Sequence, residues 1–237
     1  MNGPPAIANI IIIAFTVYIS FTGFTNTSVL RQYLFSSQAI IQGRQYYRLV
    51  TSGFLHADWM HLLFNMYSLY SFGSAVETEF GIRTFLAIYF AGIIGGDLFA
   101  LFMHRREDYY ALGASGGVCG VIFASIFLLP RSSVQLLGIP IDIPAYAYAI
   151  GFMLFSYYGI HTQLGNIGHD AHLGGSIIGL IMATILDPWI VPENPILYPA
   201  VMGLAIVILI LLYLKQSGRL SRNSARHRFE EDNYDDR

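Results

Sequence analysis

The chain has 237 residues, of which 54% are hydrophobic and only 12% are charged, about half the share typical of soluble domains. This composition excludes a soluble globular domain, and it excludes a disordered chain, which needs low hydrophobicity and high charge. The basic residues form no patch within the apolar part of the chain, so no nucleic-acid partner is expected. The composition predicts an all-α polytopic protein that resides in a lipid bilayer.

Seven apolar stretches are long enough, or nearly so, to cross a bilayer, which takes about 20 helical residues for roughly 30 Å. The first lacks a basic n-region and a small-residue cleavage site, so we expect it to remain as a span. The long connection 25–58 is expected to be a structured loop. The charged segment 215–237 is expected to be disordered. The stretches lie at about 5–24, 59–76, 82–103, 115–129, 144–160, 172–186 and 196–214.

Two of the expected helices are too short for the bilayer. Ser115 to Leu129 and His172 to Leu186 each span only about 21 Å. Each is therefore expected to begin below the membrane surface, and in alternating topology the two run in the same direction. Ser115 and His172 then lie at equal depth, and Asn65 on the other parallel helix lies at a similar level. Non-helical backbone at that depth must be buried in protein or line a water-filled cavity, so we expect a wet hollow with Ser115 at its floor.

Ser115 and His172 have the chemistry of a nucleophile and its base. A serine hydroxyl is a poor nucleophile until a base accepts its proton, and His172 at matching depth is the natural base. Gly-x-x-x-Gly motifs at 116–120 and 175–179 give both helices small-residue faces that permit close packing. Close packing is what a Ser–His hydrogen bond of about 2.6–3.2 Å requires.

Two further polar side chains, His61 and Asn65, lie one turn apart in the second stretch. Acyl transfer needs hydrogen-bond donors for the oxyanion that develops on the attacked carbonyl. His61, Asn65 and the backbone N–H of Ser115 are the candidate donors.

Other polar residues in the apolar stretches leave alternatives open. Four histidines suggest a zinc site, but H-E-x-x-H and carboxylates at helical spacing are missing, so neither a metal nor a cofactor is expected. Asp170 is poorly placed to orient the ring of His172 and is expected to be a solvated loop residue. Asp97 is expected to be buried with a partner such as a histidine. The four histidines are His56, His61, His169 and His172.

Taken together, these motifs resemble the rhomboid family of intramembrane serine proteases over roughly residues 44–186. The resemblance implies that Ser115 is the nucleophile, that His172 is the general base, and that His61 and Asn65 belong to the oxyanion site. It also implies structural roles for Arg48 and Glu77. The motifs are Tyr47-Arg48, His56, His61-x-x-x-Asn65-Met66, Ala75-Val76-Glu77 with Gly81, Gly113-Ala114-Ser115-Gly116 and Ala171-His172-Leu173-Gly174-Gly175.

The resemblance further implies a six-helix catalytic core over 1–195, open to the extracytoplasmic side, with a seventh transmembrane helix at 196–214. The expected function is a cofactor-independent serine-type endopeptidase that cleaves transmembrane protein substrates, located in the cell (plasma) membrane. One alternative is a catalytically inactive relative that binds membrane clients, which the presence of both Ser115 and His172 disfavours. Another is a small-solute transporter, which would more often show two similar halves.

Three features depart from what the family pattern implies. Tyr47 stands where the family often has Trp, and Cys119 stands where an aromatic residue often stacks on the histidine. The loops on the N-terminal side carry two Lys/Arg residues against eleven on the opposite side. The positive-inside rule then predicts the reverse of the family orientation; we keep the family orientation as the expectation.

Overall fold

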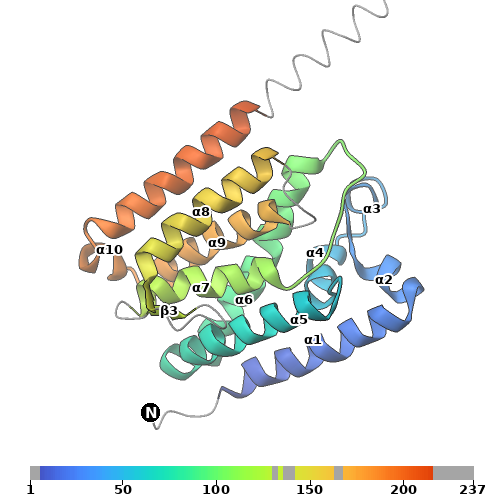
Figure 1. Ribbon diagram of the computed structural model, residues 1–237, viewed down its shortest axis with the longest axis horizontal. Coiled ribbons are helices and arrows are strands. Elements are labelled where there is room, and N and C mark those ends of the chain that lie inside the picture. Colours follow the sequence, from blue (N-terminus) through green and yellow to red (C-terminus); the bar gives the residue numbers. More distant parts are fainter. Residues whose placement is uncertain (1–5, 130–132, 136–141, 163–167, 216–237) are drawn as a thin grey trace, which may run out of the picture.

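The computed structural model describes residues 6–129, 133–135, 142–162 and 168–215, and most of them are helical (Figure 1). A 3-10 turn, η1 (Ser52–Phe54), follows α4, and a π-helical turn, η2 (Leu69–Gly73), joins α5 to α6. The helices are α1 (Ile7–Thr25), α2 (Thr27–Tyr33), α3 (Ser37–Ile41), α4 (Arg48–Thr51), α5 (Trp59–Ser68), α6 (Ser74–His104), α7 (Ser115–Leu128), α8 (Ala145–Thr162), α9 (His169–Leu186), α10 (Ile190–Glu193) and a C-terminal helix, Leu197–Lys215.

Two short antiparallel ladders interrupt the expected all-α architecture. Strand β1 (Phe35–Ser36) pairs with β2 (Tyr110–Ala111), and β3 (Ser133–Gln135) pairs with β4 (Asp142–Pro144). They form because the N–H and C=O groups of an extended backbone need hydrogen-bond partners where side chains shield them from water. The first ladder joins the long connection 26–58 to the segment that leads into α7.

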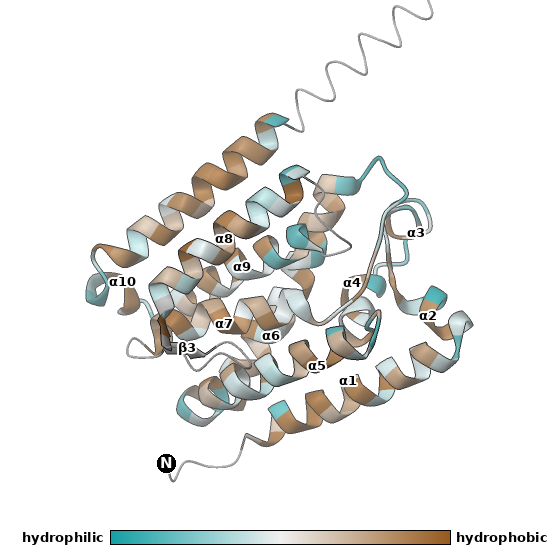
Figure 2. Ribbon diagram, in the orientation of Figure 1, coloured by the Kyte–Doolittle hydropathy of each residue, from teal (hydrophilic) through white to brown (hydrophobic). Residues whose placement is uncertain are grey.

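Four helical stretches are long and apolar enough to cross a membrane: Ile7–Thr25, Trp59–His104, His169–Leu186 and Leu197–Lys215. The second is 46 residues long and contains two of the expected spans. The chain bends between these two spans at Gly81, whose φ is +85°. Glycine takes this conformation without the steric clash that a Cβ would cause. Hydrophobic residues predominate along α1, α7 and the C-terminal helix (Figure 2). The protein therefore spans the membrane several times.

Helix α7 lies at the centre of the bundle, between α6 and α9 (Figure 1). It is 14 residues long, one fewer than the expected stretch 115–129, and every residue from Gly116 to Leu128 is buried. The C-terminal helix packs on the same group, since the ring of Tyr198 contacts Phe127 edge to face. Helix α7 is thus surrounded by protein.

Helix α9 begins at His169, so the expected start at His172 is wrong. The additional residues form a first turn because His169 and Asp170 are buried against neighbouring elements. Residues 169–186 are long enough to count as a candidate span. His172 therefore lies within the first turn of α9 instead of at its first residue.

The long connection 26–58 is structured, as expected, by α2, β1, α3, α4 and η1. Its central tie is Arg48, which is only 8% exposed and donates from Nη1 to the carbonyl oxygens of Arg31 and Leu34 at 3.0 and 2.6 Å. Of the charged tail 215–237 that is predicted to be disordered, Lys215 belongs to the C-terminal helix, and 216–237 lie outside the described residues.

Glu77 is buried and accepts backbone hydrogen bonds from Ala8 and Asn9 at 2.9 and 2.7 Å, which places a carboxylate at the N-terminus of α1. A negative charge there interacts favourably with the helix dipole. We expect Glu77→Gln to lower the free energy of unfolding by about 2 kcal/mol, because charge-assisted bonds are lost. The exposed Glu79 is the matched control: Glu79→Gln should change stability by less than about 0.5 kcal/mol in the same unfolding experiment. Equal effects would contradict this role of Glu77.

Candidate active site

Ser115 is the first residue of α7, and the backbone before it is held by the long connection. The N–H of Gly113 donates to the carbonyl of Ser52 at 3.0 Å, and the N–H of Ala114 donates to Nε2 of His56 at 3.3 Å. Gly113 has a φ of +136°, a conformation that favours glycine. Because the N–H groups of residues 113 and 114 are occupied, Ser115 supplies the first helix N–H available to a ligand.

The bonds of His56 define its tautomer. Nε2 accepts from Ala114, so the proton lies on Nδ1, which donates to the hydroxyl of Ser20 at 2.9 Å. The Ser20 hydroxyl in turn donates to the carbonyl of Phe54. Burial lowers the pKa of His56 from 6.5 to about 3. The ring is therefore neutral in the folded protein at neutral pH, and it links α1 to the backbone beside Ser115.

This neutral histidine predicts a pH-dependent stability. Unfolded His56 gains a proton below pH 6.5, whereas folded His56 does so only near pH 3. Its contribution to stability is thus complete above pH 6.5 and is lost as the pH falls toward 3, with a slope of up to about 1.4 kcal/mol per pH unit. Unfolding measured between pH 7 and 5 should show a shallower slope for His56→Gln than for the wild type. Identical slopes would contradict the assignment.

Helices α7 and α9 approach each other backbone to backbone through the two predicted glycine motifs. A Cβ added to Gly175 would lie 2.1 Å from the carbonyl oxygen of Gly116, and one added to Gly179 would lie 2.1 Å from that of Gly120. No side chain fits in either place. The sequence prediction of a close helix pair that carries Ser115 and His172 is confirmed.

The ring of His172 packs on Phe152 of α8, with centroids 5.9 Å apart and planes inclined by 27°. Phe152 thus provides an aromatic partner that residue 119, a buried cysteine, does not. Among the residues that the structure describes, no hydrogen bond joins Ser115 to His172. Catalytic hydrogen bonds are often long in the unliganded state, so the pairing of these two residues stays a prediction.

His61 and Asn65 lie on α5, on the other side of the Ser115 loop. A Cβ added to Gly113 would lie 2.9 Å from Nε2 of His61 and 3.7 Å from Oγ of Ser115, so both groups border one small space. Asn65 is buried and donates from Nδ2 to the carbonyl of His61 at 2.9 Å, which leaves its second amide hydrogen available. The structure brings His61 next to the Ser115 loop and places Asn65 one turn below.

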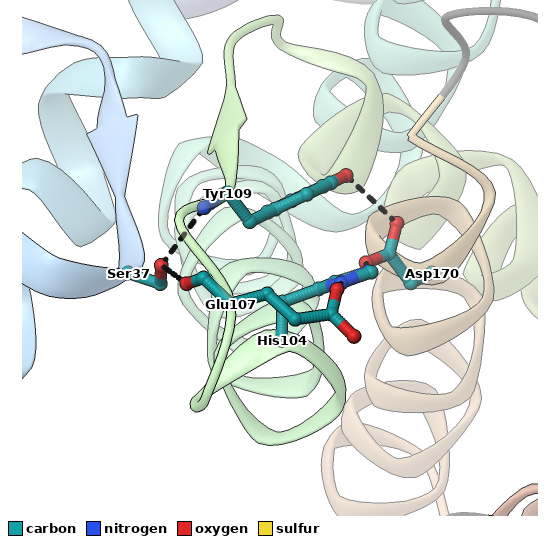
Figure 3. A network of polar contacts seen from close by, with 5 residues as sticks. All are labelled: Ser37, His104, Glu107, Tyr109 and Asp170. Atoms are coloured by element: carbon teal, nitrogen blue, oxygen red, sulfur yellow. Dashed lines mark hydrogen bonds and ion pairs between the residues drawn. The ribbon is translucent and has the colours of Figure 1, made fainter.

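A polar network at the rim of the site holds the first turn of α9 (Figure 3). Oδ2 of Asp170 lies 3.0 Å from Nε2 of His104, and its Oδ1 accepts from the Tyr109 hydroxyl at 3.3 Å. The rings of His104 and Tyr109 stack at 3.8 Å. Burial and the Asp170 carboxylate raise the pKa of Tyr109, which therefore stays a hydrogen-bond donor.

Asp170 is consequently only 4% exposed, and the expectation of a solvated loop residue is wrong. Its burial follows from the network, which extends to the long connection: Ser37 donates to the carbonyl of Glu107 and accepts from the N–H of Tyr109. The carboxylate also suits the positive end of the α9 dipole. The position of the turn that carries His172 is thus fixed from three segments.

Asp97 is buried as expected, but its partner is Ser52 and not a histidine. The Ser52 hydroxyl lies 2.6 Å from Oδ2 of Asp97 and 2.7 Å from the carbonyl of Arg48. Since the carbonyl of the same Ser52 holds the N–H of Gly113, Asp97 supports the Ser115 loop from α6. The described residues contain no group of three or more His, Cys, Asp or Glu that could hold a metal ion.

Sequence reasoning missed Phe152, Ser52, His104 and Tyr109 as parts of this site. Each acts across a tertiary contact between segments far apart in the chain, and none belongs to a motif. The one signal for them in the sequence is the histidine and tyrosine beside acidic residues at 104–109, a pattern that indicates polar contacts but not their partners.

The sequence of this chain is similar to those of known proteins over the region that contains these residues. Residues 43–189 match the family model of the Rhomboid domain. "Rhomboid protein 1, mitochondrial" of Saccharomyces cerevisiae is 30% identical over 56% of this chain and 40% of its own length. "RHOMBOID-like protein 12, mitochondrial" of Arabidopsis thaliana is 30% identical over 70% and 53%. "Rhomboid protease GluP" of Bacillus subtilis is 32% identical over 69% and 31%. The chain thus spans about half, or less, of the length of these curated relatives.

These relatives overturn the expected plasma-membrane location. Two of the three just described, and a further one from Arabidopsis thaliana, are named as mitochondrial. Proteins with this domain therefore occur in membranes other than the plasma membrane, and the expected location is wrong. The protein spans a membrane.

Proposed function

This chain belongs to the rhomboid family, and from that premise we propose that it is an intramembrane serine endopeptidase that uses a Ser115–His172 dyad. The carrying observation is the backbone contact of α7 with α9 at Gly116 and Gly175, which lie next to the serine and one turn after the histidine. Two independent ties, Ser52 and His56, hold the loop before Ser115. The contact and the ties support a site organised around the Ser115 hydroxyl.

In the proposed mechanism, His172 accepts the hydroxyl proton while Oγ of Ser115 attacks the scissile carbonyl carbon. The oxyanion that forms is stabilised by the N–H of Ser115 and by His61 and Asn65. Collapse of this tetrahedral species breaks the peptide C–N bond, and His172 gives its proton to the departing amine. Water, deprotonated by the same histidine, then hydrolyses the acyl-enzyme and regenerates Ser115.

Transmembrane proteins are the proposed substrates, because Ser115 belongs to a helix bundle that is embedded in the membrane. The intact helix of such a substrate hides its peptide carbonyls in internal hydrogen bonds, so the cleaved segment must unwind locally. Segments that contain Gly or Pro unwind most readily. A core of six transmembrane helices within 1–195 and a seventh at 196–214 complete the proposal.

The test is covalent labelling of the purified protein with a fluorophosphonate probe, which reacts with activated serines. We expect labelling of the wild type and of Ser125→Ala, a matched control on the same helix, and none of Ser115→Ala. The absence of labelling in the folded wild type would reject the proposed activity and favour an inactive client-binding protein.

Loss of an oxyanion donor should slow cleavage without abolishing it. Asn65→Ala is expected to lower the rate by about 10²–10³ and to leave part of the probe labelling. Asn194 makes the same bond to the carbonyl four residues before it, at 2.9 Å, so Asn194→Ala controls for the loss of that bond. Equal cleavage by Asn65→Ala and the wild type would remove Asn65 from the mechanism.

A further inference from the structure

A cavity of about 530 Å³ opens outside the candidate active site, between the long connection and strand β2. None of the proposed catalytic residues borders it. Its walls come from α2, β1, α4 and β2, which share one end of the molecule. The lining residues are Arg31, Leu34, Ser36, Arg48 and Tyr110.

Arg48 brings a buried positive charge to this cavity without a matching negative one. It is 8% exposed, and its hydrogen bonds run from Nε to the amide oxygen of Gln45 and from Nη1 to two backbone carbonyls. All three acceptors are neutral. Among the described residues, both ion pairs are made by His104, and no carboxylate forms an ion pair with Arg48. A buried charge is costly unless it is paired, so an anionic ligand in this cavity would stabilise Arg48.

The second arginine strengthens this reading. Arg31 lies on α2 and is exposed. Its carbonyl accepts a hydrogen bond from Arg48, and the residue lines the same cavity. Neither arginine has a carboxylate partner in the described part of the chain. The Tyr110 hydroxyl donates to Asp108 at 3.2 Å and is therefore not available to a ligand. Two arginines that line one opening suit a phosphate, which accepts hydrogen bonds from paired guanidinium N–H donors.

The residues near the cavity indicate which kind of molecule would carry such a phosphate. Tyr110, which lines it, is exposed, and so are three tyrosines of the long connection, Tyr33, Tyr46 and Tyr47. Tyrosine side chains gather at the membrane–water interface, at the level of lipid headgroups. The trimethylammonium group of a zwitterionic headgroup would add a third positive charge beside the arginines. We propose that this cavity binds the phosphate of an anionic phospholipid headgroup through Arg31 and Arg48.

The experiment measures the shift of the unfolding temperature of the full chain in detergent on addition of three probes. These are short-chain phosphatidylglycerol, phosphatidylcholine of the same chains, and inorganic phosphate. Arg31→Gln removes one of the two charges at an exposed position. Arg44→Gln removes the same charge from the same connection at a residue that does not line the cavity. Each series is repeated with Ser115→Ala, so that binding is measured independently of the proposed proteolysis.

Phosphatidylglycerol is expected to raise the unfolding temperature of the wild type, of Arg44→Gln and of Ser115→Ala. Its apparent affinity for Arg31→Gln should be about tenfold to a hundredfold weaker, as the loss of a charged hydrogen bond predicts. Inorganic phosphate should give a smaller shift with the same dependence on Arg31. Equal affinity for Arg31→Gln, equal stabilisation by phosphatidylcholine, or stabilisation by inorganic phosphate alone would each overturn the proposal.

Discussion

Substrate cleavage is expected to fall below detection in both Ser115→Ala and His172→Ala, a loss on the order of 10⁴-fold or more. In the proposed mechanism the serine supplies the bond-forming oxygen and the histidine removes its proton, so neither step proceeds without the other. For the same reason the double variant should be no slower than either single one, because residues that act as a unit lose activity non-additively.

The measurement is the initial rate of cleavage of a single-span substrate in detergent or vesicles, with the unfolding temperature recorded for each variant. Ser125→Ala is again the matched control, since Ser125 is a buried serine on α7 whose hydroxyl donates to the carbonyl of Ile122. Residual cleavage by His172→Ala near the wild-type rate would show that another base serves Ser115.

Gly175→Ala is expected to lower the free energy of unfolding by about 3 kcal/mol and to abolish cleavage as well. The added Cβ would lie 2.1 Å from a backbone oxygen, so α7 and α9 must separate. Backbone cannot move aside as a flexible side chain can. That separation also increases the distance between the helix that carries Ser115 and the one that carries His172.

The matched control is Gly151→Ala on α8, where an added Cβ meets nothing within 4 Å. An alanine there should be neutral or slightly stabilising, because alanine restricts the unfolded chain and favours a helix. Unfolding of both variants in a denaturing-detergent titration, beside the cleavage assay, tests the difference. Similar stability of Gly175→Ala and Gly151→Ala would show that the close approach of the helices is not required.

The parts of the fold that could be predicted from the sequence are those governed by local pattern. The length of apolar runs locates α1, α7 and the C-terminal helix, and a proline after residue 129 limits α7. The glycine motifs of α7 and α9 predicted backbone contact because small residues at that spacing have few other uses in a membrane helix. The structured nature of 26–58 followed from its length alone.

The remaining features depend on contacts that no local pattern contains. The start of α9 is set by the burial of His169 and Asp170 against α8 and the rim network, so the hydropathy of the segment misplaced it. Asp170 seemed solvated by its type, yet His104 and Tyr109, more than 60 residues before it, bury it. The packing of Phe152 on His172 likewise depends on the position of α8 beside α9, which no local pattern in the sequence contains.

The burial of α7 has a mechanical consequence. A free helix of 14 residues, about 21 Å long, would be mismatched with a hydrocarbon layer of roughly 30 Å and would thin or distort the lipid around it. Because every residue from Gly116 to Leu128 is covered by other helices, α7 has no lipid boundary and no such mismatch. Changes in bilayer thickness act on α1 and the C-terminal helix, which bury only 28% and 22% of their spans. The outer helices therefore shield α7, which carries Ser115, from the elastic stress of the membrane.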